Sequence, residues 1–499
     1  MLSRALRLNA YAVASQGAIL AGGILFAVIL TRLLTTEDYG LVSSFISFVV
    51  FITLVSDMGI RTTASKFVGA AFFSKDPKLW KYIVQFGCLR FLFVLIMGLA
   101  TFALSGNLAE SILHSQKYTY IFQFTGITAI IYSAMHFLEG LVSAANKYEY
   151  TFAGSVIVNA SRLVLPVAAV LFIAPTAEWT ITGVATGYLL GALSYVFFFH
   201  RTYGMKLARP EKMGKEVRTF AVYAGVLALA GAFLSNFDTV LLNAFLSPES
   251  VALYKAAQIV LIGVISLAPI SYMVIFTFFV ELEAGGNRKA QSEAYSQATR
   301  YGLIFFLPIS VMMFVLSADI IGFLYPGTYL PAADALKVFA FIPPFVFLFN
   351  MNIASLQARG EIREACKLVL LAGGASIVLN VLLIPYFGFV GAAMAYAVAY
   401  ILPTLLSFPT MARKLELHVK WTALARPVAI SVLAAGAVAA ARLLGLSNEI
   451  ALIAVFPLAC AALYLLTLEP EDRRLLDALL SLVRSEKDVI RGKGKGRGG

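Results

Sequence analysis

Long apolar runs separated by short polar breaks make up the chain from residue 10 to residue 467. Most runs hold about twenty or more predominantly apolar residues, the length that a helix needs to cross the hydrocarbon core of a membrane. The pattern predicts fourteen membrane-spanning helices, over residues 10–34, 39–60, 80–105, 117–143, 150–174, 179–201, 217–246, 249–281, 298–317, 330–357, 365–386, 388–411, 422–444 and 448–467. An even number of spans places both termini on the same side of the membrane.

One polar break early in the chain has a counterpart about 212 positions later. Residues 34–37 read Leu-Thr-Thr-Glu, and residues 246–249 read Leu-Ser-Pro-Glu. Both stretches resemble a helix start, because Thr36 or Ser247 can cap open backbone N–H groups and the acidic residue that follows suits the helix dipole. The correspondence predicts that the chain consists of two similar halves.

A second similarity, between residues 143–147 and 356–360, lies near the same offset. Two copies of six helices that start on the same side predict parallel repeats, related by a pseudo-two-fold axis along the membrane normal. The predicted fold class is therefore an all-α polytopic membrane protein with two additional helices after the second repeat. The predicted units are an amino-terminal lobe, a cytoplasmic linker, a carboxy-terminal lobe, the two additional helices and a basic tail, at residues 1–204, 205–216, 217–415, 416–470 and 471–499.

Composition agrees with a membrane protein, since 60% of the residues are hydrophobic and 13% are charged. Soluble domains have roughly 45–50% apolar and about 25% charged residues. The mean hydropathy is +0.84, and the polar breaks are too short to hold a soluble domain. Any chemistry must therefore occur inside the helix bundle or at its two ends.

The net charge of +12 follows membrane topology and does not indicate a nucleic-acid surface. All but seven of the 39 lysines and arginines fall on one side of the predicted bundle. Positive residues collect on the cytoplasmic side of membrane proteins, so both termini are predicted to be cytoplasmic. No nucleic-acid partner is expected.

No cofactor and no metal are expected either. The three cysteines and four histidines are scattered, without a CxxC pair or the spacing of metal ligands. The sequence has no Walker loop, so ATP does not drive the protein directly. An ion gradient, the membrane potential or consumption of the substrate on the far side must then supply the energy.

Seven cations remain after those of the cytoplasmic side are set aside: Arg32, Arg90, Lys117, Arg162, Lys255, Lys337 and Arg442. Lys117 and Arg442 fall at helix ends near the outer surface, where a charge costs little. The other five fall in or near predicted spans, and a charge at mid-bilayer costs roughly 2.5–3.5 kcal/mol. We therefore predict that these five line a wet interior. Arg162 lies deepest in its span. For the other four residues, the alternative to a wet interior is that the side chain extends to the membrane surface.

Three acidic residues, Asp57, Glu139 and Asp238, also fall within predicted spans. Asp57 and Glu139 lie near the cytoplasmic ends, where helix capping or ion pairing is the alternative to a transport role. Asp238 is a candidate for handling protons or cations, or for pairing with one of the bases. Because bases outnumber acids, the interior suits an anionic headgroup such as a phosphate or pyrophosphate.

Several motifs together resemble the polysaccharide transporter family (oligosaccharide flippases, Wzx-like) of the MOP (MATE-like) superfamily. The first is Leu-Thr-Arg-Leu-Leu-Thr-Thr-Glu-Asp-Tyr-Gly-Leu at residues 30–41, followed by Ser-Asp-Met-Gly-Ile at 56–60. The second is Asn-Phe-Asp-Thr-Val-Leu-Leu-Asn at 236–243, then Ser-Pro-Glu at 247–249 and Tyr-Lys-Ala-Ala at 254–257. The resemblance covers about residues 5–415 and includes the helix count and the repeats.

The resemblance implies a multi-pass protein of the prokaryotic plasma membrane that is not an enzyme. It would move a polyprenyl-linked oligosaccharide from the inner to the outer leaflet by alternating access, with the headgroup in a cationic cavity. Its partners would be the lipid-linked oligosaccharide, membrane lipids, and H⁺ or Na⁺ as a coupling ion. Arg32, Asp57, Asp238 and Lys255 lie on the motif segments, whereas Arg90 and Arg162 follow from the charge argument alone.

Three other functions are compatible with parts of the pattern. A multidrug and toxin extruder of the same superfamily would have a more acidic or apolar cavity. A lipid II flippase shares the cationic cavity and fourteen helices, but the opening motifs fit it less well. A membrane glycosyltransferase or polymerase needs an acidic catalytic group in a substantial outer loop, and the early outer acidic pair, Glu37 and Asp38, already has a capping role.

Overall fold

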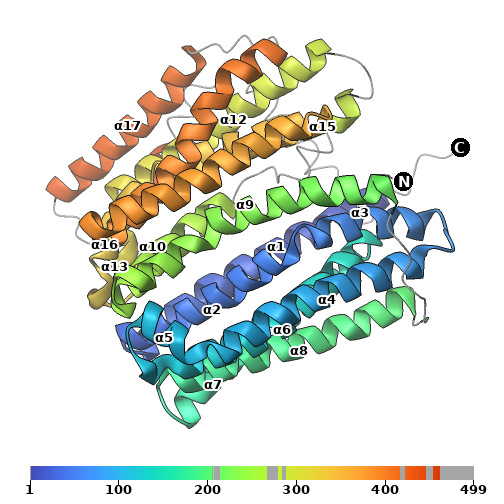
Figure 1. Ribbon diagram of the computed structural model, residues 1–499. Helices are drawn as coiled ribbons and strands as arrows, with labels where there is room; N and C mark the ends of the chain where they lie inside the picture. Colours follow the sequence, from blue (N-terminus) through green and yellow to red (C-terminus); the bar gives the residue numbers. More distant parts are fainter. Residues whose placement is uncertain are drawn as a thin grey trace, which may run out of the picture.

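The computed structural model describes residues 2–204, 206, 214–266, 279–283, 288–415, 422–444 and 453–460. These residues form helices joined by short connections, and no strand occurs among them (Figure 1). The amino-terminal helices are α1 Leu2–Leu33, α2 Thr36–Asp57, α3 Ile60–Phe73, α4 Leu79–Ala103, α5 Ser105–Leu113, α6 Thr119–Ala144, α7 Tyr148–Phe172 and α8 Ala177–Tyr203. The following helices are α9 Lys215–Phe245, α10 Pro248–Ser266, α12 Arg288–Val315, α13 Ser317–Leu324, α14 Ala332–Phe339, α15 Ile342–Ala358, α16 Ile362–Leu415 and α17 Thr422–Leu443.

The predicted class, an all-α polytopic membrane protein, is confirmed. Within the described ranges, nine helices are long and apolar enough to cross a membrane, or ten if α14 and α15, which meet at 44°, form one broken span. Helix α16 is continuous by hydrogen bonding but breaks at Gly388, whose backbone angles are φ 59° and ψ −142°. It therefore corresponds to the two spans expected at 365–386 and 388–411. The spans expected at 249–281 and 448–467 lie partly outside the described residues, and fourteen spans stays a prediction.

The helix boundaries of the two halves recur at the offset seen in the sequence. Helix α1 ends at Leu33 and α9 at Phe245, and the short helices α5 and α13 begin at Ser105 and Ser317. Both pairs are about 212 positions apart. Each short helix is followed by a single 3₁₀ turn, η1 at Gln116–Tyr118 and η2 at Gly327–Tyr329. This order of elements is the one that an internal repeat produces, and the two-lobe organisation stays a prediction.

The start of α2 is capped one residue earlier than the sequence pattern suggested. The Thr35 hydroxyl, and not that of Thr36, accepts a bond from the Asp38 backbone N–H at 3.1 Å and donates one to the Asp38 carboxylate at 2.7 Å. The Asp38 carboxylate also accepts the Ala177 backbone N–H at 3.1 Å. One acidic side chain therefore secures the starts of both α2 and α8, which agrees with its expected capping role.

Two sides of the bundle can be defined from the helix directions. We use the term amino-terminal face for the side where α1 begins and α2 ends, and far face for the side of α5 and α13. Figure 1 shows α9 running along the boundary between the amino-terminal helices and those that follow it. The predicted linker, 205–216, lies mostly outside the described residues, as does the tail 471–499.

Helix α2 contacts the carboxy-terminal half at both of its ends through glycine. Near the far face, a Cβ on Gly40 would lie 1.9 Å from the Pro248 carbonyl oxygen. Near the amino-terminal face, Gly59 has φ +73°, and a Cβ there would lie 2.3 Å from the Ala224 carbonyl carbon. Glycine is required at Gly59 for both reasons, the backbone angle and the close approach. Helix α2 therefore packs closely against α10 at one end and against α9 at the other.

Candidate functional site

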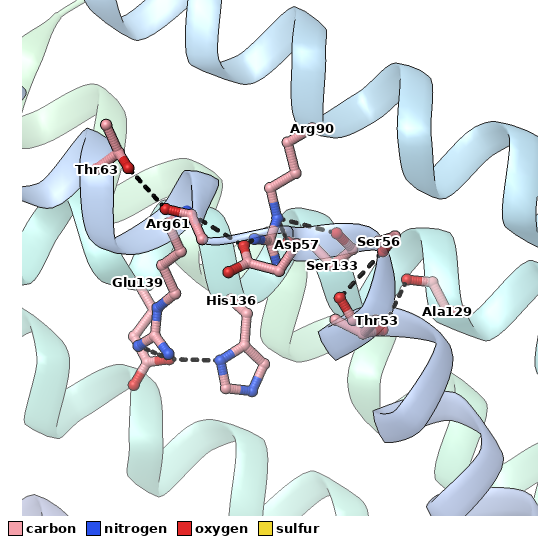
Figure 2. Close-up of polar contacts among 11 residues, drawn as sticks. Thr53, Ser56, Asp57, Arg61, Thr63, Arg90, Ala129, Ser133, His136 and Glu139 are labelled. Carbon is pink, nitrogen blue, oxygen red and sulfur yellow. Dashed lines mark hydrogen bonds and ion pairs between the residues drawn. The ribbon is translucent and has the colours of Figure 1, made fainter. Parts of the chain in front are cut away.

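A buried ion pair joins α2 to α4 near the amino-terminal face (Figure 2). The guanidinium of Arg90, 3% exposed, pairs with the carboxylate of Asp57, 8% exposed, at the end of α2. The Arg90 Nε also donates to the Ser133 hydroxyl at 3.0 Å and to its carbonyl oxygen at 3.2 Å, which ties α6 to the pair. Because Asp57 neutralises it, Arg90 does not present a free positive charge in this conformation.

A second polar cluster lies next to this pair. The Glu139 carboxylate on α6 is 3.3 Å from the Arg61 guanidinium of α3 and 3.1 Å from His136 Nδ1 (Figure 2). The Asp57 carboxylate links the two clusters, because it accepts the Arg61 backbone N–H at 3.1 Å. Glu139 and Asp57 thus both form ion pairs. Ion pairing was the alternative that the sequence left open to a transport role for these two residues.

Arg162 lies on α7 among aromatic rings, and it is half-buried. Its Cζ is 5.2 Å from the Phe26 ring centroid, and its Nη1 donates to the Tyr188 hydroxyl at 3.3 Å. The Tyr188 ring contacts Tyr132 at 4.7 Å, and Tyr132 contacts His136 at 4.5 Å between centroids. Within the part of the chain that the structure describes, no carboxylate pairs with Arg162. We call Arg162, Phe26, Tyr132 and Tyr188 the arginine box.

The helices of the arginine box approach closely because of glycine. A Cβ on Gly187 of α8 would lie 2.9 Å from the Arg162 Cα, and one on Gly183 would lie 2.7 Å from the Pro166 Cα. Small residues of this kind let membrane helices pack backbone to backbone. The close contact of α7 with α8 places the Arg162 side chain toward Phe26 of α1 and Tyr188 of α8.

Asp238 lies on α9, 1% exposed, in a separate polar cluster of the carboxy-terminal half. Its carboxylate accepts bonds from the Tyr254 hydroxyl, from Gln258 Nε2 at 3.2 Å, and from the Thr239 backbone N–H at 2.6 Å. The Lys255 ammonium donates to Gln258 Oε1 at 2.7 Å. Gln258 therefore bridges the anion and the cation, and Lys255 is linked to Asp238 through it.

The other two predicted cations lie at the ends of helices. Arg32 is exposed in the last turn of α1. Lys337 is exposed on the short helix α14 and pairs with Asp334 at 2.9 Å. The eight candidate residues are therefore not gathered at one point: Asp57, Arg90 and Glu139 lie close together, Asp238 and Lys255 form a second group, and Arg162 stands in the arginine box.

Four polar partners were missed by the sequence argument: Arg61, His136, Tyr254 and Gln258. His136 and Glu139 are three positions apart on one helix, and Tyr254 and Gln258 are four apart, spacings that put side chains on one helix face. That signal was available in the sequence. For the described ranges, no three or more His, Cys, Asp or Glu side chains are arranged to hold a metal ion.

Comparisons with solved structures show which known fold the chain shares. A lipid II flippase MurJ in an inward closed conformation superposes with a TM-score of 0.70 at 15% identity, covering 94% of this chain and 100% of that one. An inward-facing multidrug resistance MATE family transporter of the MOP superfamily gives 0.62 at 12% identity, covering 80% and 94%. The chain therefore has the fold of these membrane transporters of the MOP superfamily.

Sequence comparison gives the family. Residues 9–283 match the profile described as "Polysaccharide biosynthesis protein", and the chain belongs to this family. An uncharacterized membrane protein of Methanocaldococcus jannaschii is 22% identical over 422 residues, 80% of this chain and 82% of that one. A probable low-salt glycan biosynthesis flippase of Haloferax volcanii is 24% identical over 199 residues, 39% of this chain and 41% of its own.

Proposed function

We propose that the protein is a flippase for a polyprenyl-phosphate- or polyprenyl-pyrophosphate-linked oligosaccharide. It moves this lipid from the inner to the outer leaflet of the prokaryotic plasma membrane by alternating access. Both termini are cytoplasmic, so the amino-terminal face is the entry side. Membership of a polysaccharide biosynthesis family supports the proposal, as does the relative described as a probable glycan biosynthesis flippase.

The observation that carries the proposal is the arginine box. A guanidinium without a paired carboxylate, flanked by Phe26 and Tyr188 inside the bundle, suits a phosphate joined to a sugar. Arginine binds a phosphate with two parallel N–H bonds, and aromatic rings with a few polar groups are the usual lining of sites for organic ligands. A site for cationic drugs would place a carboxylate there instead.

The two lobes at 1–204 and 217–415 are the units that move against each other. The boundary along α2 closes at both ends in this conformation, with Gly40 against Pro248 and Gly59 against Ala224. One of these contacts must separate to admit the headgroup, while the polyprenyl tail stays in the surrounding lipid. The additional helices within 416–470 and the basic tail at 471–499 lie outside this repeat.

The remaining charged candidates take different roles in the proposal. Arg162 is the substrate-facing cation. Lys255 is held beside Asp238 through Gln258, and Asp238 with its ring of donors is the group that handles H⁺ or Na⁺. Asp57, Arg90 and Glu139 hold α2, α3, α4 and α6 together at the amino-terminal face. Arg32 and Lys337 lie near the far face, where a released headgroup would pass.

The test is the leaflet distribution of the lipid-linked glycan in cells that are depleted of the protein and complemented with variants. Arg162→Ala removes a charge-assisted bond of about 1.5–3 kcal/mol, so outward movement falls roughly ten- to a hundredfold. A membrane-impermeant sugar label on intact cells measures the outer pool. Lys117→Ala, which removes an exposed cation near the far face, is the matched control and retains wild-type labelling. Normal labelling with Arg162→Ala would remove the arginine box from the mechanism.

A further inference from the structure

The sequence places seven cations outside the predicted cytoplasmic side, and the structure describes all seven of them. Lys117 and Arg32 are exposed near the far face. Arg90 pairs with Asp57, Lys337 with Asp334, and Arg442 with Asp319. Five of the seven are therefore at a surface or neutralised by a carboxylate. The two that remain are Arg162 and Lys255.

Lys255 is balanced within its own cluster. Gln258 accepts from its ammonium and donates to the carboxylate of Asp238, so one cation and one anion share a bridging amide. The segments outside the described ranges that fall in the predicted spans, 267–278, 448–452 and 461–467, contain one charged residue, the acidic Glu449. Among these seven cations, Arg162 alone lies inside the bundle without a balancing carboxylate in the described part of the chain.

One guanidinium matches one phosphodiester group. A phosphodiester carries a single negative charge and offers two oxygens to the paired N–H donors of an arginine. A pyrophosphate diester carries a second negative charge on a second phosphate, which would lie in the low-dielectric interior without a counter-charge.

We propose that the carrier lipid has one phosphate, so that the sugar is joined to the polyprenol through a monophosphate and not through a pyrophosphate. The inference rests on the flippase function proposed above. The rings of Phe26 and Tyr188 lie at 5.2 and 5.9 Å from the Arg162 Cζ, so the sugar next to that phosphate packs on an aromatic face. Recognition thus covers the phosphodiester and the first sugar.

The first experiment identifies the glycolipid that accumulates when the protein is depleted. Mass spectrometry of the membrane lipids distinguishes the two carriers, which differ by one HPO₃ group. Accumulation of a monophosphate-linked glycan supports the inference. Accumulation of a pyrophosphate-linked glycan overturns it while leaving the flippase function intact. If no lipid-linked glycan accumulates, the proposed function fails and the inference fails with it.

The second experiment uses the purified full-length protein in vesicles of its host's lipids. The probes are the glycolipid isolated above and a synthetic analogue with the same glycan and polyprenol but the other number of phosphates. We expect the monophosphate form to cross roughly tenfold faster or more, because the second charge has no partner inside. Equal rates, or faster movement of the pyrophosphate form, would contradict the inference.

Two substitutions at Arg162 distinguish the effect of its positive charge from the effect of its paired N–H donors. Arg162→Gln removes the cation and slows the monophosphate probe roughly tenfold or more, whereas Arg162→Lys keeps the charge but loses the paired donors and falls in between. Lys117→Gln removes a cation that lies outside the box and leaves the rate unchanged. A loss with Lys117→Gln as large as that with Arg162→Gln would show that overall charge, and not the arginine box, governs transport.

Discussion

Ser44 and Asn243 are joined across the boundary between the two halves of the protein, although 199 positions separate them in the chain. The Ser44 hydroxyl donates to Asn243 Oδ1 at 2.9 Å, and the Asn243 Nδ2 donates back to the Thr239 carbonyl oxygen at 2.8 Å. Both side chains are buried, at 0% and 1% exposed. Because this polar contact is fully buried, the boundary between α2 and α9 is closed at this point. The two helices must separate here if the far face opens.

A covalent link at this contact is therefore expected to stop transport. In a background with Cys88, Cys366 and Cys460 replaced by alanine, Ser44→Cys and Asn243→Cys are combined and cross-linked with an oxidant or a short thiol-reactive linker. Transport in vesicles is expected to fall to background and to return when a disulfide is reduced. Each single cysteine variant serves as the control. Undiminished transport by the fully cross-linked protein would show that this contact does not open.

The close approach at Gly59 makes a second prediction, and the chain offers a matched control. Gly59 and Gly360 have φ +73° and +74°, but a Cβ at Gly360 meets nothing within 4 Å, whereas one at Gly59 collides with the α9 backbone. Alanine strains a left-handed position by roughly 1–2 kcal/mol, and Gly360 ends α15 with the Glu361 N–H bonded to the Leu356 carbonyl, as a left-handed residue at a helix end does. Only Gly59→Ala also forces the amino-terminal face apart. We expect lower thermal stability and slower transport for Gly59→Ala than for Gly360→Ala, and similar values for the two would refute the closure contact.

The ion pair of Asp57 and Arg90 makes a third prediction, about stability. Removing one partner leaves an uncompensated buried charge, and such changes cost about 3–5 kcal/mol. Asp57→Asn and Arg90→Gln should each lower the melting temperature in detergent. The double variant should be more stable than either single variant, because the two groups are coupled.

The exposed pair of Lys337 and Asp334 supplies the comparison for that experiment. Its side chains are 47% and 63% exposed, and exposed pairs contribute roughly 0–1 kcal/mol. Lys337→Gln should therefore leave the melting temperature close to that of the wild type. Additive losses in the Asp57→Asn and Arg90→Gln double variant would show that the two residues do not interact.

Much of the fold could be predicted from the sequence, because apolar runs of membrane length and helix-start signals are local properties of the chain. The offset between Leu33 and Phe245, and between Ser105 and Ser317, agrees with the repeat seen in the polar breaks. Boundaries were less certain: the cap of α2 is Thr35 and not Thr36, since helix starts are defined only to within a residue or two. The break at Gly388 agrees with the expected division of residues 365–411 into two spans.

The pairing of the charged candidates could not be predicted in the same way. Whether Arg90 meets Asp57 depends on how far α2 and α4 are rotated about their axes, which is set by packing among distant segments. The same holds for Arg61 and Glu139, which are 78 positions apart. By contrast, the depth of Arg162 in its span follows from counting residues along a helix. Its aromatic neighbours come from other helices, among them α1 and α8, so the arginine box could not be predicted from the sequence.

The cluster around Asp238 carries the last prediction, which separates ion coupling from substrate binding. Its carboxylate is surrounded by donors from Tyr254, Gln258 and Thr239. This arrangement stabilises the ionised carboxylate, which can also bind a proton. Asp238→Asn keeps the shape but removes the ionisable group. In vesicles with an imposed H⁺ or Na⁺ gradient, the variant should lose the stimulation by the gradient while still moving the lipid in its absence. Tyr254→Phe, which removes one donor and leaves the carboxylate, should keep part of the stimulation. A gradient response of wild-type size in Asp238→Asn would assign this residue to packing within α9 and α10 and leave the coupling group elsewhere.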